Sequence, residues 1–156
     1  MAAKKSFKEK LKAEGYPKVS PIPPKMEARL GKGTLLVPAA WEVDELMRKV
    51  RKGKVTTAAD LRQALAEKHG TNHACAIVTG ISIRVAACAA EEDRAAGKKR
   101  VTPYWRTLLK GGELNDKLPG GVAAQKEALE AEGHTIVKRG KRWFVEDLER
   151  ALVSPG

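Results

Sequence analysis

The sequence predicts a mainly α-helical domain of the winged helix-turn-helix type, with a small C-terminal β-hairpin and a basic N-terminal extension. Apolar residues recur at helical spacing through the middle of the chain, and a short turn separates two of these helical segments. Near the C-terminus, two apolar runs flank a basic turn. The net charge of +11 over 156 residues, with 30 Lys+Arg against 19 Asp+Glu, favours a nucleic acid as partner.

Residues 1–33 are expected to form a basic, proline-rich and flexible extension, and residues 34–153 the folded domain. Ser6 is placed to cap a short helix that ends at Gly15. The four prolines that follow within residues 17–24 predict a stretch without regular structure. Such a tail would add phosphate attraction that does not depend on DNA sequence.

The domain is expected to begin with a short strand or extended entry near residues 34–38, followed by a helix over residues 39–50. The apolar face of that helix contains Trp41, Val43, Leu46, Met47 and Val50. A second helix is predicted from an N-cap at Thr56 or Thr57 to Gly70, with Leu61, Ala64 and Leu65 buried.

A third helix is predicted over about residues 74–96, and it would be the second member of the helix-turn-helix pair. Ile77, Ile81, Val85 and Cys88 fall on one apolar face, while several alanines allow close packing. A fourth helix over residues 120–133 and a final helix over residues 145–153 flank the hairpin. Four cations crowd its turn and predict phosphate contact, with a purely structural ribbon as the alternative: Lys138, Arg139, Lys141 and Arg142.

The most specific motif lies between Thr102 and His134. It contains Pro103-Tyr104-Trp105-Arg106, then Gly120-Gly121, Gln125-Lys126 and the sequence EAEGH that ends at His134, and residues 53–61 upstream read GKVTTAADL. Together these resemble the O6-alkylguanine-DNA alkyltransferases, over about residues 37–135. Members of that family use the cysteine of a Pro-Cys-His-Arg motif to take the alkyl group from a flipped-out guanine.

The acceptor cysteine of that motif is missing from this chain. Tyr104 stands at the cysteine position and Trp105 at the histidine position. A phenol, with a pKa of ~10 against ~8.5 for a thiol, cannot replace a thiolate at neutral pH. The chain therefore resembles the alkyltransferase-like branch, which binds O6-alkylguanine without repairing it and passes the lesion to nucleotide excision repair. The resemblance implies lesion recognition on DNA with neither a catalytic residue nor a cofactor.

The resemblance assigns a lesion pocket to Tyr104, Trp105, Arg106 and Glu132. For the two aromatic residues, filling the core is the alternative. Arg106 is expected to brace the motif loop, and Glu132 either accepts a hydrogen bond from a base edge or braces Arg106 or Trp105. The family's tyrosine falls at Ala58 and its asparagine near Ala96, and Arg84 is the candidate substitute for its arginine near Ala76 and Ile77.

DNA contacts are predicted in the basic loop before the helix-turn-helix, on the third helix and at the hairpin. The loop precedes a helix N-terminus, whose amides attract phosphate. The predicted contact residues are Lys52, Lys54, Thr56, Thr57, Arg84, Lys138, Arg139, Lys141 and Arg142.

Two other functions are open: a general winged-helix DNA-binding or regulatory protein without lesion preference, and an active alkyltransferase that uses Cys75 or Cys88. Neither cysteine has an adjacent activating pair in the sequence. His69, His73 and Cys75 have a loosely metal-like spacing without a fourth ligand, so no metal is expected.

The expected partners are double-stranded DNA and nucleotide excision repair proteins, and the chain is expected to act as a monomer. Aromatic residues make up only 4% of the chain, which disfavours a single-strand binder built on stacking. Two cysteines make no disulfide framework, and neither a signal peptide nor a membrane span is evident, so a cytoplasmic location (nucleoid-associated if bacterial) is predicted.

Overall fold

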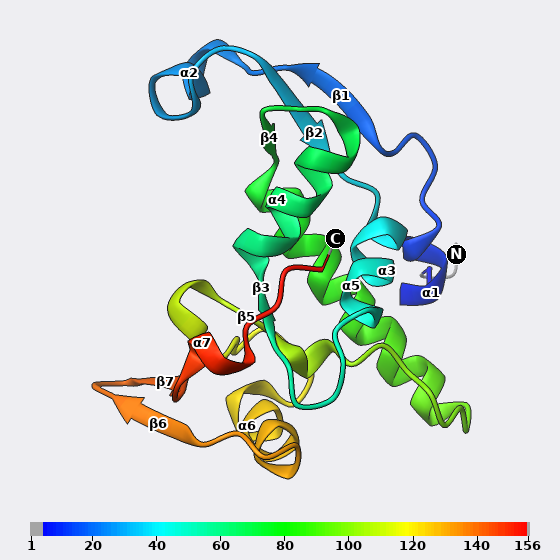
Figure 1. Cartoon of the computed structure of the whole chain (residues 1–156). Helices are drawn as coiled ribbons and strands as arrows, with labels where there is room; N and C mark the ends of the chain where they lie inside the picture. Colours follow the sequence, from blue (N-terminus) through cyan, green and yellow to red (C-terminus); the bar gives the residue numbers. More distant parts are fainter. Residues whose placement is uncertain (1–4, 156) are drawn as a thin grey trace.

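A long helix, α5 (Ala76–Ala95), runs through the middle of this computed structural model, which describes residues 5–155 (Figure 1). The helices α3 (Ala40–Arg48) and α4 (Ala58–His69) pack against it. Leu36, from β2 (Thr34–Val37), joins their apolar side chains in the main core. The expected strand or extended entry and the first three expected helices of the domain are thus confirmed.

Both ends of α4 are capped by residues that the sequence predicted for this role. The Thr57 hydroxyl accepts a hydrogen bond from the Asp60 amide at 3.2 Å, and Asp60 lies in the first turn, where its charge favours the helix dipole. Gly70 ends the helix with a φ of 65°, in the left-handed region that glycine adopts at low cost.

The buried face of α5 differs from the predicted one. Ile77 and Ile81 are 74% and 58% exposed, and Val85 and Cys88 are only partly buried. The buried face consists of small residues around Ile83, namely Thr79, Ser82, Ala86, Ala87, Ala89 and Ala90. Small side chains let α5 approach its neighbours closely. The face that carries them is therefore buried, although the larger apolar residues lie on the opposite face. The prediction that these alanines pack closely is confirmed.

The segment before residue 34 is more ordered than the expected solvated tail. Helix α1 (Phe7–Leu11) packs against α5, and β1 (Lys18–Pro21) pairs antiparallel with β2. Proline at the first position of α2 (Pro24–Leu30) is compatible with a helix, because the amide it lacks has no partner there. The prediction that the prolines prevent regular structure is therefore wrong. β4 (His73–Ala74) adds to this sheet, parallel to β2.

The C-terminal part forms a second, smaller core. It contains β3 (Thr56–Thr57), paired parallel with β5 (Thr107–Leu108), and α6 (Gly121–Ala131). The expected hairpin is confirmed as β6 (Ile136–Arg139) and β7 (Arg142–Val145), and α7 (Leu148–Ala151) is shorter than predicted.

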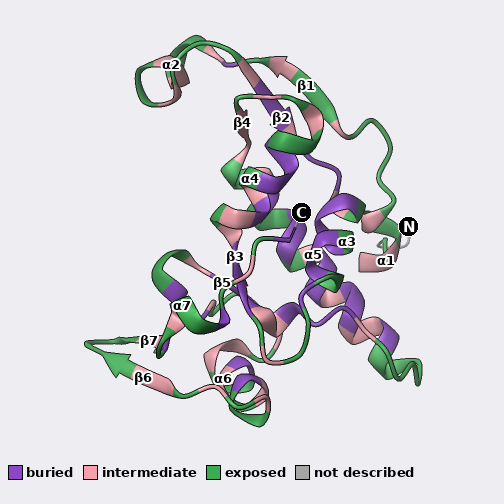
Figure 2. Ribbon diagram, viewed as in Figure 1, coloured by how far each residue is buried: buried purple, intermediate pink, exposed green. Residues whose placement is uncertain are grey.

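The two cores meet at the motif. Trp105 packs against both of them, and the buried residues run through the middle of the fold while the hairpin tip is exposed (Figure 2). Among the described residues, no helix is both long and apolar enough to cross a membrane.

Candidate lesion-binding site

The motif forms a single 3₁₀ turn, Tyr104–Arg106, between α5 and β5. Tyr104 is buried in the main core, and its hydroxyl donates a hydrogen bond to Glu91 Oε1 at 2.5 Å. Burial, together with this bond and the charge of Glu91, raises the pKa of Tyr104 well above its usual range. The phenol thus stays protonated at neutral pH and is not a nucleophile.

Trp105 lies edge-on to Tyr104, with ring centroids 5.4 Å apart and an interplanar angle of 77°. The guanidinium carbons of Arg94 and Arg106 lie 5.9 and 5.6 Å from its ring centroid. Its indole nitrogen is buried and lies close enough to Glu132 to help lower the pKa of that carboxyl. Trp105 therefore presents its ring, and not its indole N–H, to a ligand.

Arg106 and Glu132 form a nearly buried bidentate pair. Arg106 donates to the two Glu132 oxygens at 2.9 and 2.7 Å, and to the Val50 carbonyl at 2.6 Å. Burial favours the neutral acid, but the hydrogen bonds from Arg106 outweigh it and lower the pKa of Glu132. Both side chains are thus charged at neutral pH and hold the motif turn against α6. Arg106 thus makes hydrogen bonds that suit the bracing role expected of it, and Glu132 is its partner.

An open cavity of about 770 Å³, the motif cavity, lies beside this turn. Tyr104, Trp105 and Glu132 line it, as three of the four predicted pocket residues. The rest of the wall comes from α5, α6 and the loops around them, including Lys52, Glu91, Arg94, Pro119, Gly120 and Gln125. The cavity combines two aromatic side chains with charged ones of both signs, and three of these are carboxylates: Glu91, Glu127 and Glu132. Its size and aromatic wall fit a planar ligand such as a nucleobase. Arg106, the fourth predicted residue, does not line this cavity but the neighbouring basic cleft.

A strongly basic cleft of about 590 Å³ lies on another side of Trp105. Its lining includes no carboxylate, and its cations are Arg48, Arg94, Lys98, Lys99, Arg100 and Arg106. Several of them pair with acids nearby: Arg48 with Asp44 and Lys98 with Asp93. Lys99 and Arg100 form no ion pair among the described residues, and no sequence motif pointed to them.

The predicted DNA-contact residues fall into three groups. Lys52 and Lys54 are exposed in the loop before β3, although Lys54 also donates to the Arg150 carbonyl at 3.3 Å. Thr56 and Thr57 are buried, because they form β3 and cap α4. Their side chains have no access to DNA in this structure, so the prediction is corrected for both. Arg84 is exposed on α5.

The hairpin presents its four cations to solvent. Lys138 lies over the Trp143 ring and Arg139 over the Phe144 ring, at 5.6 and 5.4 Å from the centroids. Arg142 makes a long, exposed ion pair with Glu113 at 3.8 Å. The hairpin packs on α6 and the turn at Lys110–Gly112, which leaves its tip free.

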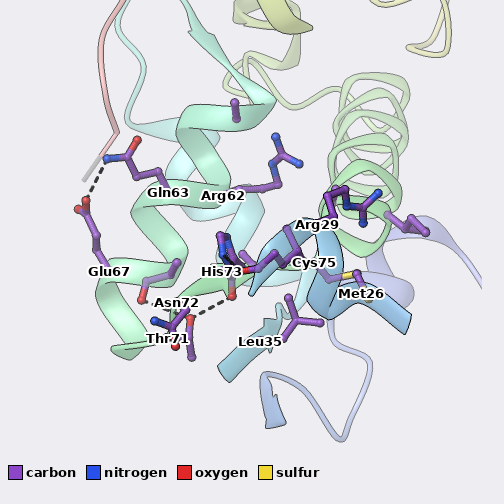
Figure 3. A pocket seen from close by; sticks show the side chains of 16 residues that line it. Met26, Arg29, Leu35, Arg62, Gln63, Glu67, Thr71, Asn72, His73 and Cys75 are labelled. Carbon is purple, nitrogen blue, oxygen red and sulfur yellow. Dashed lines mark hydrogen bonds between the residues drawn. The ribbon is translucent and has the colours of Figure 1, made fainter. Parts of the chain in front are cut away.

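Cys75 lies away from the motif turn, whereas Cys88 is close enough to Tyr104 for its charge to help raise the pKa of that phenol. Cys75 lines a cavity of about 650 Å³ between α2, α4 and the start of α5, together with Arg29 and His73 (Figure 3). Cys88 lies on α5, and burial raises the pKa of its thiol. His69 contacts Glu42 at 2.7 Å and His73 the Leu30 carbonyl at 3.0 Å, and no group of three potential metal ligands occurs among the described residues.

Gln125 is a positioning residue whose role was not predicted. Its buried amide donates to the Trp105 and Thr107 carbonyls at 3.1 and 3.2 Å and accepts from the Asn115 amide at 2.7 Å. It thus fixes the motif turn to α6 and to the loop that closes the cavity. In the sequence, Gln125 stood out only because Gln125-Lys126 is part of the motif that resembles the alkyltransferases.

The fold is similar to that of S. pombe Atl1, solved as a crystal structure in complex with damaged DNA containing O6-carboxymethylguanine. The two structures align with a TM-score of 0.52 and 19% sequence identity, over 74% of this chain and 94% of that chain. No protein-family profile and no curated protein sequence matches this chain.

Proposed function

We propose that this protein binds double-stranded DNA, recognises O6-alkylguanine-type damage in the motif cavity, and leaves the alkyl group in place. The observation that carries the proposal is an aromatic, partly polar cavity at a motif turn whose acceptor position holds a buried tyrosine. The fold shared with Atl1, which was solved on damaged DNA, supports the same conclusion.

The chemistry of the cavity favours binding over alkyl transfer. Trp105 supplies a flat wall, and the lining carries charges of both signs, with Lys52 and Arg94 beside Glu91, Glu127 and Glu132. No cysteine lines the cavity, and the raised pKa of Cys88 reduces its thiolate fraction. An alkyltransferase that uses Cys75 or Cys88 would need a labelled methyl group to move to one of them, and to be lost in a Cys75→Ser/Cys88→Ser variant.

The proposed DNA surface combines the α4–turn–α5 unit with the basic loop at Lys52 and Lys54 and with the hairpin. In this arrangement the hairpin acts as the wing of a winged helix, and its exposed cations contact phosphates. We propose residues 34–153 as the main DNA-binding part of the chain, on which the ordered segment before residue 34 packs. We further propose that the monomer marks the lesion in the cytoplasm or nucleoid for nucleotide excision repair proteins.

The decisive test is a competition titration at fixed, stated salt, with duplexes that differ only by one O6-methylguanine in place of guanine. We expect tighter binding to the damaged duplex, and loss of that preference in Trp105→Ala. Because Trp105 packs against both cores, Trp105→Phe serves as the matched variant: it keeps an aromatic ring but a smaller one. Equal, salt-dependent binding of both duplexes would instead indicate a general DNA-binding protein. The absence of the family's tyrosine at Ala58 and of its arginine near Ile77 would then explain the missing preference for damaged DNA.

A further inference from the structure

The N-terminal helix α1 is fastened to α5 by carboxylates. The Glu92 carboxylate accepts hydrogen bonds from the Phe7 and Lys8 amides, both at 3.0 Å, and so caps α1. Lys8 Nζ lies 2.7 Å from Asp93 Oδ1, and this hydrogen bond helps to lower the pKa of Asp93. Figure 1 shows α1 lying beside α5 and α3. Residues 6–11 are thus a docked element rather than a free tail.

Docking brings two cations to the same aromatic ring. Lys10 Nζ lies 4.5 Å from the Phe7 ring centroid, and the Arg84 guanidinium carbon lies 5.7 Å from it. Both cations are exposed, and neither forms an ion pair with a carboxylate among residues 5–155. Two like charges held near one ring without a direct ion pair favour an anion between or across them.

The position of this pair on the molecule indicates which anion it binds. Arg84 belongs to the exposed side of α5, called here the α5 stripe, whose members are Ile77, Ile81, Arg84 and Cys88. Further along the same helix, Glu91 and Arg94 line the motif cavity. DNA that lies on the stripe and reaches the cavity therefore runs past Phe7 and Lys10.

We infer that Lys10 and Arg84 form a phosphate-binding site for the DNA backbone, and that α1 is part of the DNA interface. The site depends on the docking of α1, to which the Glu92 cap and the Lys8–Asp93 ion pair both contribute. This inference rests on the proposed DNA binding, but not on the proposed preference for damaged DNA.

The direction in which one substitution changes DNA affinity distinguishes this site from a general effect of surface charge. Removal of a carboxylate from a DNA-binding surface should tighten DNA binding, because it removes repulsion from the phosphates. Glu92→Ala, however, removes the cap of α1. The docking that holds Lys10 near Arg84 should then weaken. We therefore expect Glu92→Ala to weaken binding of an undamaged duplex, on the order of fivefold at low salt. The matched control is Glu45→Ala, which removes an exposed acid on α3 that forms no ion pair within residues 5–155 and should leave binding unchanged or tighter.

A double-mutant cycle tests whether docking positions Lys10. We expect Lys10→Ala to weaken DNA binding in the wild-type chain and to have little further effect in Glu92→Ala. Lys12→Ala, at the end of the same segment, is the control for a loss of charge alone. If Glu92→Ala does not fold, Lys10→Ala against Lys12→Ala still decides the question.

Three outcomes remain distinct in this experiment. A weaker Glu92→Ala and a non-additive Lys10→Ala support the site. Tighter binding by Glu92→Ala, or equal effects of Lys10→Ala and Lys12→Ala, would overturn the site while leaving DNA binding intact. A wild-type chain that binds no duplex would overturn both the site and the proposed function.

Discussion

Tyr104 occupies the position that corresponds to the acceptor cysteine, and its surroundings suppress its reactivity. It is buried, its hydroxyl is hydrogen-bonded to Glu91, and its pKa is raised mainly by burial. The residue at this position therefore supports the cavity wall and has no chemical role. Tyr104 fills the main core and also lines the motif cavity, so it combines the two roles that were alternatives for the aromatic pair.

Tyr104→Phe should cost stability without changing the shape of the site. The hydrogen bond to Glu91 is lost, but Glu91 is partly exposed, so water can replace the hydroxyl. We expect a decrease of about 1 kcal/mol in the free energy of unfolding, measured by urea denaturation. Duplex binding should stay within about twofold of the wild type. A loss of several kcal/mol, or of DNA binding, would show that the hydroxyl has a role beyond this bond.

The Arg106–Glu132 pair makes a pH-dependent contribution to stability. The pKa of Glu132 is lowered in the folded protein, so its contribution is fully present above the usual glutamate pKa and is lost as the pH falls through the lower, folded-state value. Glu132→Gln leaves Arg106 nearly buried without its counter-charge, and we expect a loss of about 3 kcal/mol at pH 7.

This pH dependence is measurable by urea unfolding of the wild type and Glu132→Gln at a series of pH values. The difference between them should shrink in acid, once Glu132 is protonated in the folded wild type too. A difference that stays constant down to strongly acidic pH would show that the charge of Glu132 is not what stabilises the turn.

At the scale of elements, the start of α6 closes the motif cavity through Gly120. Gly120 has a φ of +80°, and a Cβ there would lie 2.5 Å from the Ala124 Cβ. Gly111 has a similar φ of +75° but no neighbour within 4 Å. Both glycine-to-alanine changes strain the backbone, and only Gly120→Ala also creates a clash. We expect Gly120→Ala to destabilise the protein by about 1 kcal/mol more than Gly111→Ala, measured by thermal or urea unfolding.

Local signals predicted the helices and the hairpin, but not which surfaces they bury. Thr57, Gly70 and the basic turn at Gly140 mark their elements through capping and turn chemistry, which act over a few residues. The buried face of α5 was mispredicted, because larger apolar residues lie on its exposed side and alanines on the packed one. The docking of α1 depends on Glu92, 85 positions from Phe7, and no local pattern reveals it.

At the scale of the whole molecule, the site is assembled from distant segments. Tyr104, Trp105 and Glu132, which the motif resemblance grouped together, line one cavity. It did not reveal Lys52, Arg94 or the buried Gln125, because their proximity depends on how the loops close around the turn. It also did not reveal the basic cleft, whose cations come from α3, from the end of α5 and from the loop after it.

The net charge of +11 and the motif cavity should contribute to DNA binding in separable ways. Phosphate contacts release counterions, so affinity should fall steeply with salt, with a slope in log K against log[salt] of about −0.9 per phosphate neutralised. The cavity contacts a base rather than a phosphate, so the ratio of affinities for damaged and undamaged duplex should hardly change with salt. Titration of both duplexes over a series of salt concentrations measures the slope and the ratio together.

Arg139→Ala/Lys141→Ala tests this separation, since both residues are exposed at the hairpin tip and remote from the motif cavity. We expect the double variant to flatten the slope by about 2 and to weaken both duplexes equally, with an unchanged damage preference. Trp105→Phe should do the reverse, since it keeps the slope and reduces the preference. If the preference for damaged DNA fell with salt in parallel with the affinity, the phosphate contacts would be responsible for that preference. The motif cavity would then not be the element that distinguishes damaged DNA.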